Sequence, residues 1–377
     1  MATQYYNAVA HNTSPFITVY GQDGDVSTKI ADPATLPAGN SYDASWTGDN
    51  TYLAVAHDTT PFISVYKRAG DVLTKIANPA TLPPATSVGT SWSADGTYLA
   101  VCSFASPNIL VYKRSGDVLT KIANPATLPT GVGVGTSWSA DGTSLAVAHV
   151  TTPYVTVYNR ISDTLTKIAD PATLPTGTGR GAAWTPDGTH LAIAHDTSPY
   201  VTVYARSGNT LTKLSNPATL PAGNGNAVSW SPDGTYLSVA NRLYPNVTVY
   251  KLSGSTLTKI ANPIGIPSGH GNGTSWSPDG AYLSVAYAGS PYVAIYSRSG
   301  DVLTKLSDPA TPPSGTGNGT AYSSSLNAAP TAPTLVGPAD LAEVPADSPL
   351  LYDWVFNDPD AGQTQSEFAL VRRKVAP

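Results

Sequence analysis

Glutamate is almost absent from this sequence of 377 residues: only Glu343 and Glu367 occur, both close to the C-terminal end. Any site that lies before Glu343 must therefore work without a glutamate acid or base. Charged residues make up 12% of the chain, roughly half the usual quarter, and the net charge is −5 with no basic run. This charge balance argues against an electrostatic nucleic-acid surface, so no nucleic-acid partner is predicted.

Cysteine and long apolar runs are equally scarce. Cys102 is the one cysteine, which excludes an internal disulfide framework and predicts a small buried hydrophobic residue. No apolar run approaches the roughly 18 residues that cross a bilayer, so no membrane insertion is predicted. The first residues, from Met1 to Asn7, contain neither a basic nor an apolar segment, so no secretory signal is predicted. The hydrophobic content of 41% is nevertheless enough for a core.

A repeat with a period of 46 residues dominates the sequence. Its most regular position is an aromatic residue, found at Trp46, Trp92, Trp138, Trp184, Trp230, Trp276 and Tyr322. A proline keeps the same spacing at Pro15, Pro61, Pro107, Pro153, Pro199, Pro245 and Pro291. Seven copies without an insertion indicate one structural unit repeated around or along an axis.

Each copy predicts four short β-strands. In the copy that contains Trp92 they are Gly89–Ser93, Tyr98–Ser103, Asn108–Lys113 and Val118–Ala123, separated by Gly-containing turns. The second strand is apolar on both faces, as expected for a sheet packed between two neighbouring sheets. Four antiparallel strands in each of seven copies predict an all-β, seven-bladed β-propeller.

The ends of the repeat predict how the ring closes. The first copy lacks its first strand and begins at Tyr6–His11, while the missing strand reappears as Gly319–Ser323. One blade would thus combine both ends of the repeat, with the C-terminal segment as its innermost strand. A solenoid is the alternative, but it needs no such permutation of its end copies.

Two stretches carry a resemblance to known families. Ser229–Ala240 (SWSPDGTYLSVA), followed within the repeat by PYVTVY, resembles the WD-repeat class of propellers. It departs from that class because the Gly-His and Trp-Asp positions are missing and Tyr66 and its equivalents replace the second Trp. The run AVAHDTSPYVTVYxRSGxxLTKLxNPATLPxGxGN resembles repeats of tail-associated proteins of bacteriophages and prophages, over about residues 5 to 325.

The composition changes after the repeats. We predict a propeller over residues 1–326, a Pro-rich extended linker over 327–338, and a partial module over 339–377. Strands are expected at Leu350–Asp358 and Glu367–Arg373, and this module resembles the first half of a fibronectin type III-like β-sandwich with Trp354 in its core. Half a sandwich is marginal alone, so either the natural chain continues or another subunit completes the module.

Catalytic and metal-binding patterns are weak. His11, His57, His149 and His195 occupy one repeat position, which a propeller spreads around a ring rather than around one ion. The repeated Asp of the first hairpin lacks the alternating ligands of a calcium loop and is explained by turn chemistry. No G-x-S-x-G elbow occurs. We therefore predict no metal, no cofactor and no catalytic residue, and a protein that is not an enzyme.

Comparison of the seven copies locates a candidate binding surface instead. Variation concentrates in the loop between the second and third strands and at the residue just before the first strand, which a propeller places on one face around the channel mouth. The residues predicted to bind a ligand there are Tyr42, Phe104, Arg180, Arg242, Tyr244 and Tyr287, together with His57 and His195. Aromatic rings and Arg are common anchors for sugars and proteins. Neutral drift in exposed loops is the alternative explanation.

Three functions are compatible with these observations. The first, which rests on the phage resemblance, is a non-enzymatic virion protein of a tail or fibre that attaches to a host-surface glycan or protein, contacts other tail proteins through the C-terminal module and is assembled in the host cytoplasm. The second is a non-viral, cytoplasmic scaffold that binds a protein partner. The third is a lactonase- or sialidase-like propeller enzyme, for which Asp58 and Asp196 are the only obvious channel-side acids.

Overall fold

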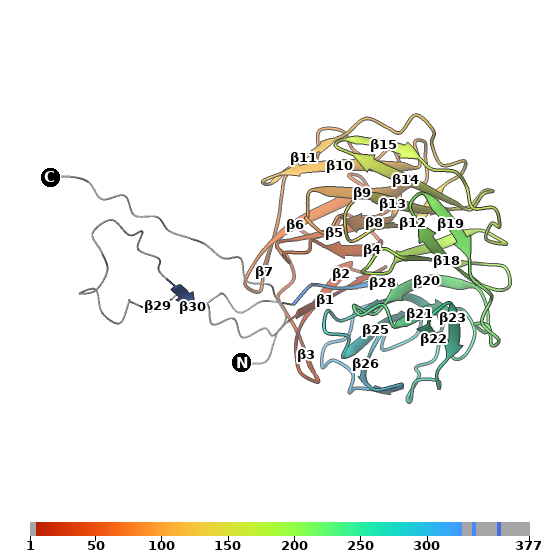
Figure 1. Ribbon diagram of the computed structural model, residues 1–377. Coiled ribbons are helices and arrows are strands. Elements are labelled where there is room, and N and C mark those ends of the chain that lie inside the picture. Colours follow the sequence, from red (N-terminus) through yellow and green to blue (C-terminus); the bar gives the residue numbers. More distant parts are fainter. Residues whose placement is uncertain (1–4, 326–333, 337–352, 356–377) are drawn as a thin grey trace, which may run out of the picture. The chain divides into compact units, whose positions relative to one another are not determined.

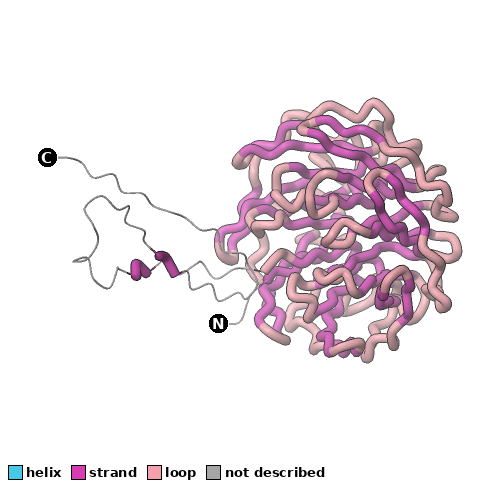
Figure 2. The backbone as a smooth tube through the Cα atoms, viewed as in Figure 1, coloured by secondary structure: helices cyan, strands magenta, loops and turns pink. Residues whose placement is uncertain are grey.

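Seven four-stranded antiparallel sheets make up the repeat region of the computed structural model, which describes residues 5–325, 334–336 and 353–355 (Figure 1). We number the sheets as blades 1 to 7 in the order of their second strands. The described chain consists of strands and connecting loops (Figure 2). No helix long and apolar enough to cross a membrane occurs in this part of the chain. The all-β, seven-bladed prediction is confirmed.

The strand bounds repeat from blade to blade. The innermost strands are β28 (Gly317–Tyr322), β4 (Ser41–Trp46), β8 (Ser87–Trp92), β12 (Gly133–Trp138), β16 (Gly179–Trp184), β20 (Gly225–Trp230) and β24 (Gly271–Trp276). The second strands are β1 (Tyr5–His11), β5 (Tyr52–His57), β9 (Tyr98–Ser103), β13 (Ser144–His149), β17 (His190–His195), β21 (Tyr236–Asn241) and β25 (Tyr282–Tyr287). The third strands are β2 (Ile17–Asp23), β6 (Ile63–Ala69), β10 (Ile109–Ser115), β14 (Val155–Ile161), β18 (Val201–Ser207), β22 (Val247–Ser253) and β26 (Val293–Ser299). The outermost strands are β3 (Val26–Lys29), β7 (Val72–Lys75), β11 (Val118–Lys121), β15 (Thr164–Lys167), β19 (Thr210–Lys213), β23 (Thr256–Lys259) and β27 (Val302–Lys305).

The ring closes through both ends of the repeat, as the sequence predicts. Strand β28 pairs antiparallel with β1, with Thr320 opposite Val9 and Tyr322 opposite Asn7. Figure 1 shows the blue β28 beside the red β1. Each innermost strand also contacts the innermost strands of the two adjacent blades, and β28 contacts both β24 and β4. The innermost strands therefore surround a central channel.

The core lies between blades rather than within them. One apolar cluster joins Tyr52 and Val65 of blade 2 to Trp92, Leu99 and Tyr112 of blade 3. All residues of the second strands are buried in five blades, which explains why these strands carry apolar residues on both faces. Cys102 is buried and forms no disulfide within the described residues, and its burial is as predicted.

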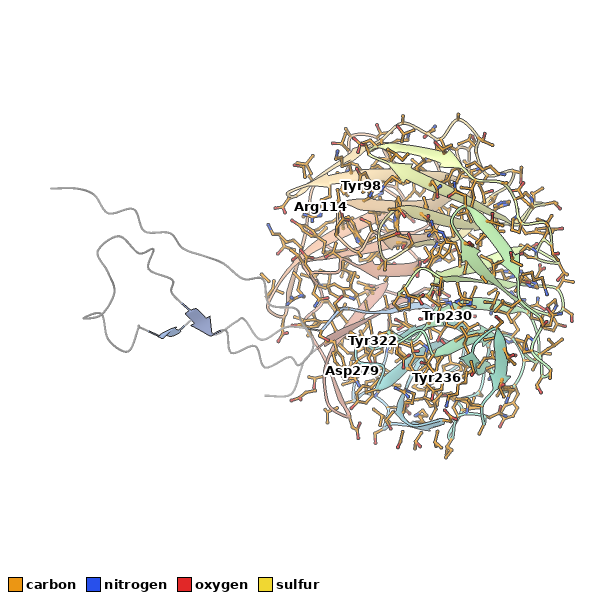
Figure 3. The ribbon with its side chains drawn as sticks, viewed as in Figure 1. Tyr98, Arg114, Trp230, Tyr236, Asp279 and Tyr322 are labelled. Carbon is orange, nitrogen blue, oxygen red and sulfur yellow. The ribbon has the colours of Figure 1, made fainter. Side chains whose placement is uncertain are left out.

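A polar contact between a tyrosine and an aspartate at the edge of five of the seven interfaces adds to this apolar packing. The hydroxyls of Tyr98 and Tyr236, labelled in Figure 3, each donate a hydrogen bond to an aspartate in the next blade. The acceptors are Asp163 and Asp301, at 2.5 Å in both cases. The Tyr282 hydroxyl reaches Asp25 at 3.0 Å and so links blade 7 to blade 1. These contacts place the same pair of side chains at successive interfaces around the ring.

The chain divides into two units, Ala2–Ser325 and Leu326–Pro377 with Met1. In the second unit β29 (Thr334–Val336) pairs antiparallel with β30 (Asp353–Val355). Strand β29 falls inside the segment predicted as a linker, and β30 falls inside the predicted strand Leu350–Asp358. The remainder of the predicted linker and of the fibronectin-like module lies outside the described residues.

Candidate functional site

A cavity of about 870 Å³ lies at one mouth of the central channel. Its wall is formed by the innermost strands of the seven blades and by loops that follow the second strands of blades 3, 4 and 6. A cavity of this size fits a small organic ligand.

A β-bulge in every innermost strand supplies the side chains that line the cavity at the start of that strand. In β4 the pairing with β5 shifts between Ser41 and Asp43, which makes Tyr42 the extra residue. The same shift makes Arg180 the extra residue of β16. Bulges of this kind re-aim a side chain, and here the extra residue of each blade lines the cavity. The seven extra residues are Asn318, Tyr42, Val88, Val134, Arg180, Asn226 and Asn272.

The position after the bulge holds very small residues because it lies directly against the innermost strand of the next blade. An added Cβ at Gly89 would lie 2.4 Å from the Val134 carbonyl oxygen, and one at Gly135 would lie 2.6 Å from that of Arg180. Blade 2 departs from this pattern because it places a carboxylate, Asp43, in this part of the wall. The equivalents of Asp43 are Gly89, Gly135, Gly181, Ala227, Gly273 and Gly319.

Asp43 is half-buried and sits against the next blade. Its Oδ2 accepts a hydrogen bond from the Thr90 backbone N–H at 2.9 Å. Burial raises the pKa of the Asp43 carboxyl to about 7, although the backbone N–H groups of Thr90 and Ala44 lower it in part. A carboxylate has about four acceptor positions, so the bond from Thr90 leaves Asp43 able to accept a proton from a ligand or a water. Asp43 is therefore a carboxylate in a cavity, with a pKa near neutrality.

Arg180 lies three blades away, on the opposite part of the channel wall. Its Nη2 atom is 3.6 Å from Oδ2 of Asp196, which follows β17 in the same blade. The Arg180 Nε is buried and has no hydrogen-bond partner among the described residues. Arg180 thus places a positively charged guanidinium in the wall of the cavity that also holds Asp43.

The three asparagines at the bulge have a structural contact. Asn226 donates to the Gly271 carbonyl at 2.8 Å, Asn272 to the Gly317 carbonyl at 2.9 Å, and Asn318 to the Ser41 carbonyl at 2.8 Å. Each bond links one innermost strand to the next. These side chains stabilise the wall between blade 6 and blade 2 while their carbonyl oxygens remain polar groups of the cavity lining.

The predicted ligand-binding residues separate into two groups. Tyr42, Phe104, Arg180 and Arg242 line the cavity. Tyr244 is 72% exposed but is not part of the lining. Whether any of them binds a ligand stays a prediction.

Tyr287, His57 and His195 do not lie at the rim, which corrects their predicted placement. All three are fully buried at the end of a second strand. The Tyr287 hydroxyl bonds that of Tyr296 at 2.9 Å. The Nε2 atoms of His57 and His195 bond hydroxyls seven residues later, in the third strand, at 3.1 and 2.9 Å. The side chain at this position points into the blade, where it satisfies a buried hydroxyl instead of meeting a ligand.

These buried histidines predict that stability depends on pH. Burial lowers the pKa of His57 to about 4, and His11, His149 and His195 behave alike. The unfolded chain binds protons below about pH 6.5, whereas the folded chain binds them only near pH 4, so stability falls as the pH decreases through this window. His57→Asn, which copies Asn241 of blade 6, should reduce the loss between pH 7.5 and pH 5 by about 2 kcal/mol in urea unfolding. An unchanged pH dependence would contradict the burial effect.

Comparison of the seven repeat copies did not single out Asp43, because the variable position that it identified is the preceding one, which is Tyr42 in blade 2. The pattern that could have revealed it is present: one aspartate at a repeat position that otherwise holds only glycine or alanine. No group of three or more His, Cys, Asp or Glu side chains converges in the part of the chain that the structure describes. The repeated turn aspartates are occupied locally, since Asp95 accepts from Ser93 Oγ and the Thr97 N–H at distances up to 3.0 Å.

Comparison with known proteins gives the fold a context. Residues 136–316, just under half of the chain, match the family model described as "Lactonase, 7-bladed beta-propeller". This part of the ring, from β12 to the loop before β28, is similar to that family of propellers. No curated protein sequence matches the chain.

Solved structures agree on this fold. A protein from Lactobacillus plantarum has a TM-score of 0.68 at 20% identity, with 85% of this chain and 99% of that chain covered. The periplasmic gluconolactonase of Pseudomonas aeruginosa has a TM-score of 0.66 at 20% identity, with 85% and 99% covered. A proposed 6-phosphogluconolactonase from Bacteroides fragilis has a TM-score of 0.67 at 17% identity, with 85% and 98% covered. At these identities the likeness shows the fold alone.

The comparisons overturn three predictions. The non-enzymatic tail or fibre protein, the prediction that the chain is not an enzyme, and the virion location are all contradicted, because the matching family model and two of these structures are described as lactonases, one of them periplasmic. They favour the lactonase-like propeller enzyme, which was the weakest of the sequence-based alternatives.

Proposed function

We propose that this propeller binds a cyclic ester in the channel mouth and hydrolyses it, with Asp43 as the general base. The observation that carries the proposal is the position of Asp43: one carboxylate in the wall of the channel cavity, at a level that is otherwise lined by glycine and alanine. The wall opposite it presents the positively charged guanidinium of Arg180. The family match to residues 136–316 and the gluconolactonase among the similar structures support the same class of substrate.

The chemistry follows from these two groups. Asp43 accepts a proton from a water molecule as the water oxygen attacks the lactone carbonyl carbon. Arg180 stabilises the negative charge that develops on the carbonyl oxygen. The bond between the carbonyl carbon and the ring oxygen then breaks, and the proton on Asp43 passes to the ring oxygen. The product is a hydroxy acid, and the Asp43 carboxylate is regenerated.

The pKa of Asp43 predicts the pH dependence of this reaction. The base acts only when it is ionised, and burial raises the pKa of Asp43 to about 7. We therefore expect kcat/KM to rise about tenfold per pH unit below pH 7 and to level off above it. Discontinuous assays of lactone consumption between pH 5 and pH 8, corrected for spontaneous hydrolysis at each pH, give this pH–rate profile.

The proposal is tested with glucono-δ-lactone and a series of γ-lactones. Ring opening yields a carboxylic acid, so proton release in a weak buffer reports turnover directly. We expect at least one of these lactones to be consumed faster than in the protein-free control. If none is consumed above the spontaneous rate at any pH in this range, the hydrolytic role of the channel is wrong.

A further inference from the structure

The cavity wall is divided into an apolar and a polar sector, and the division follows the blades. Two positions matter here: the extra residue of the bulge, which lines the cavity in every blade, and the residue that follows the second strand, which lines it in blades 3, 4 and 6. In blade 3 these are Val88 and Phe104, and in blade 4 they are Val134 and Val150. No other blade is apolar at both positions: the remaining pairs are Asn318 and Asn12, Tyr42 and Asp58, Arg180 and Asp196, Asn226 and Arg242, and Asn272 and Ala288.

Two further observations make this sector unusual. Val132, in the loop before β12, also lines the cavity, whereas its equivalents in the other blades are Asn, Thr or His. Phe104 is 52% exposed and Val150 is 38% exposed. Single exposed apolar residues are common on proteins, but five side chains on adjacent blades inside one cavity form a continuous apolar surface in contact with water.

From this arrangement we infer that the cyclic ester carries an aliphatic chain, which lies on Val88, Phe104, Val132, Val134 and Val150 while the lactone ring faces Asp43 and Arg180. The inference rests on the proposed function and specifies its substrate class. An apolar chain releases the water that now covers these five side chains, and each CH₂ group buried is worth about 0.8 kcal/mol, or about a fourfold gain in affinity. A polyhydroxylated sugar lactone gains nothing from this sector, since its hydroxyls would lose hydrogen bonds to water there.

The polar sector is suited to the other end of such a ligand. Arg180, Asn226, Arg242, Asn272 and Asn318 follow one another around blades 5, 6, 7 and 1. They provide donors and acceptors for an ester and, after ring opening, a guanidinium for the new carboxylate. The two sectors together match an amphipathic molecule with one polar and one aliphatic end.

The test uses γ-butyrolactone and γ-decalactone, which share the ring and differ by a hexyl chain. Binding is measured by calorimetry on Asp43→Asn, so that the ligand is not consumed, and turnover is measured on the unaltered chain. We expect γ-decalactone to bind at least 30-fold more tightly than γ-butyrolactone. Equal affinities would overturn the inference whether or not either lactone is hydrolysed, while a strong preference without any hydrolysis would overturn the catalytic role and keep the ligand class.

A double variant assigns the preference to the apolar sector. Phe104→Asp with Val150→Asp copies the residues of blades 2 and 5, Asp58 and Asp196, so both loops retain sequences that the fold already uses. The preference for γ-decalactone should fall at least tenfold. Leu243→Thr is the matched control, because Leu243 is a 57% exposed apolar residue on an equivalent loop outside the cavity lining, and Thr59 stands at its position in blade 2. A loss of preference in the control, or none in the double variant, would overturn the assignment.

Discussion

Asp43→Asn should lower kcat/KM for lactone hydrolysis by roughly 10²- to 10⁴-fold, the usual contribution of a positioned general base. Asparagine keeps the size of the side chain and an oxygen that can accept the bond from the Thr90 N–H, but it cannot take a proton from water. The measurement is initial-rate turnover of the best lactone at pH 8, where Asp43 of the unaltered chain is ionised. Asp43→Gly should have the same effect. The fold should tolerate this substitution because five other blades carry glycine at this position.

Asp58→Asn is the matched control for this prediction. Asp58 is one of the two acids that sequence analysis considered for an enzyme, it does not line the cavity, and Asn12 occupies its place in blade 1. Its replacement should leave turnover unchanged. If Asp58→Asn abolished turnover and Asp43→Asn did not, the base would have been assigned to the wrong carboxylate.

Stability distinguishes a catalytic carboxylate from a structural one at the same position. Folding raises the pKa of Asp43 to about 7, so its contribution to the free energy of unfolding becomes less favourable as the pH rises from about 4 to 7. Asp43→Asn should therefore unfold at a higher temperature than the unaltered chain at pH 8. If Asp43 served only to accept the Thr90 N–H, its replacement would lower the unfolding temperature or leave it unchanged. A gain in stability together with a loss of turnover is typical of a strained functional group.

The fold could be predicted from the sequence because the repeat alone restricts the possible architectures. One copy cannot bury both faces of its sheet, so seven copies and a displaced innermost strand leave a closed ring as the consistent solution. The predicted strand Tyr98–Ser103 has the bounds of β9, whereas Asn108–Lys113 is shifted relative to β10, which ends at Ser115. Strand ends depend on turn geometry and are the least determined part of a repeat.

The site was harder to predict because its residues come from different blades. Tyr42, Arg180 and Arg242 were found through variation between copies, and the structure places them in one cavity. His57 and Tyr287 were assigned to the rim because they stand at the end of a strand, yet the strand turns their side chains into the blade. The absence of glutamate from the ring argued against an enzyme, whereas the structure places a half-buried aspartate, Asp43, in the channel wall, and we propose this residue as the base.

Removal of residues 317–377 should have a larger effect on stability than any point substitution in the ring. The truncation deletes β28, which exposes the backbone edge of β1 and breaks the ring between blade 7 and blade 2. It also removes the buried bond from Thr320 Oγ1 to Asn7 at 2.7 Å and that from the Tyr322 hydroxyl to Gln22 at 2.6 Å. We expect these losses to lower the free energy of unfolding by about 5 kcal/mol or more, which is most of the stability of a typical domain. We expect the truncated chain to aggregate or to lose cooperative thermal unfolding, as followed by circular dichroism.

Two comparisons attribute this loss to the missing strand. A chain that ends at Ser325 keeps β28 and should unfold cooperatively, since it retains the compact unit Ala2–Ser325. A synthetic peptide of residues 315–325 should restore cooperative unfolding to the chain that lacks 317–377. The matching segment of blade 7, residues 269–279, contains GNGTSW where β28 has GNGTAY, so it can form the same backbone bonds but has no hydroxyl for Gln22. Complementation should therefore be weaker with this peptide, and equal complementation by both would show that backbone pairing alone closes the ring.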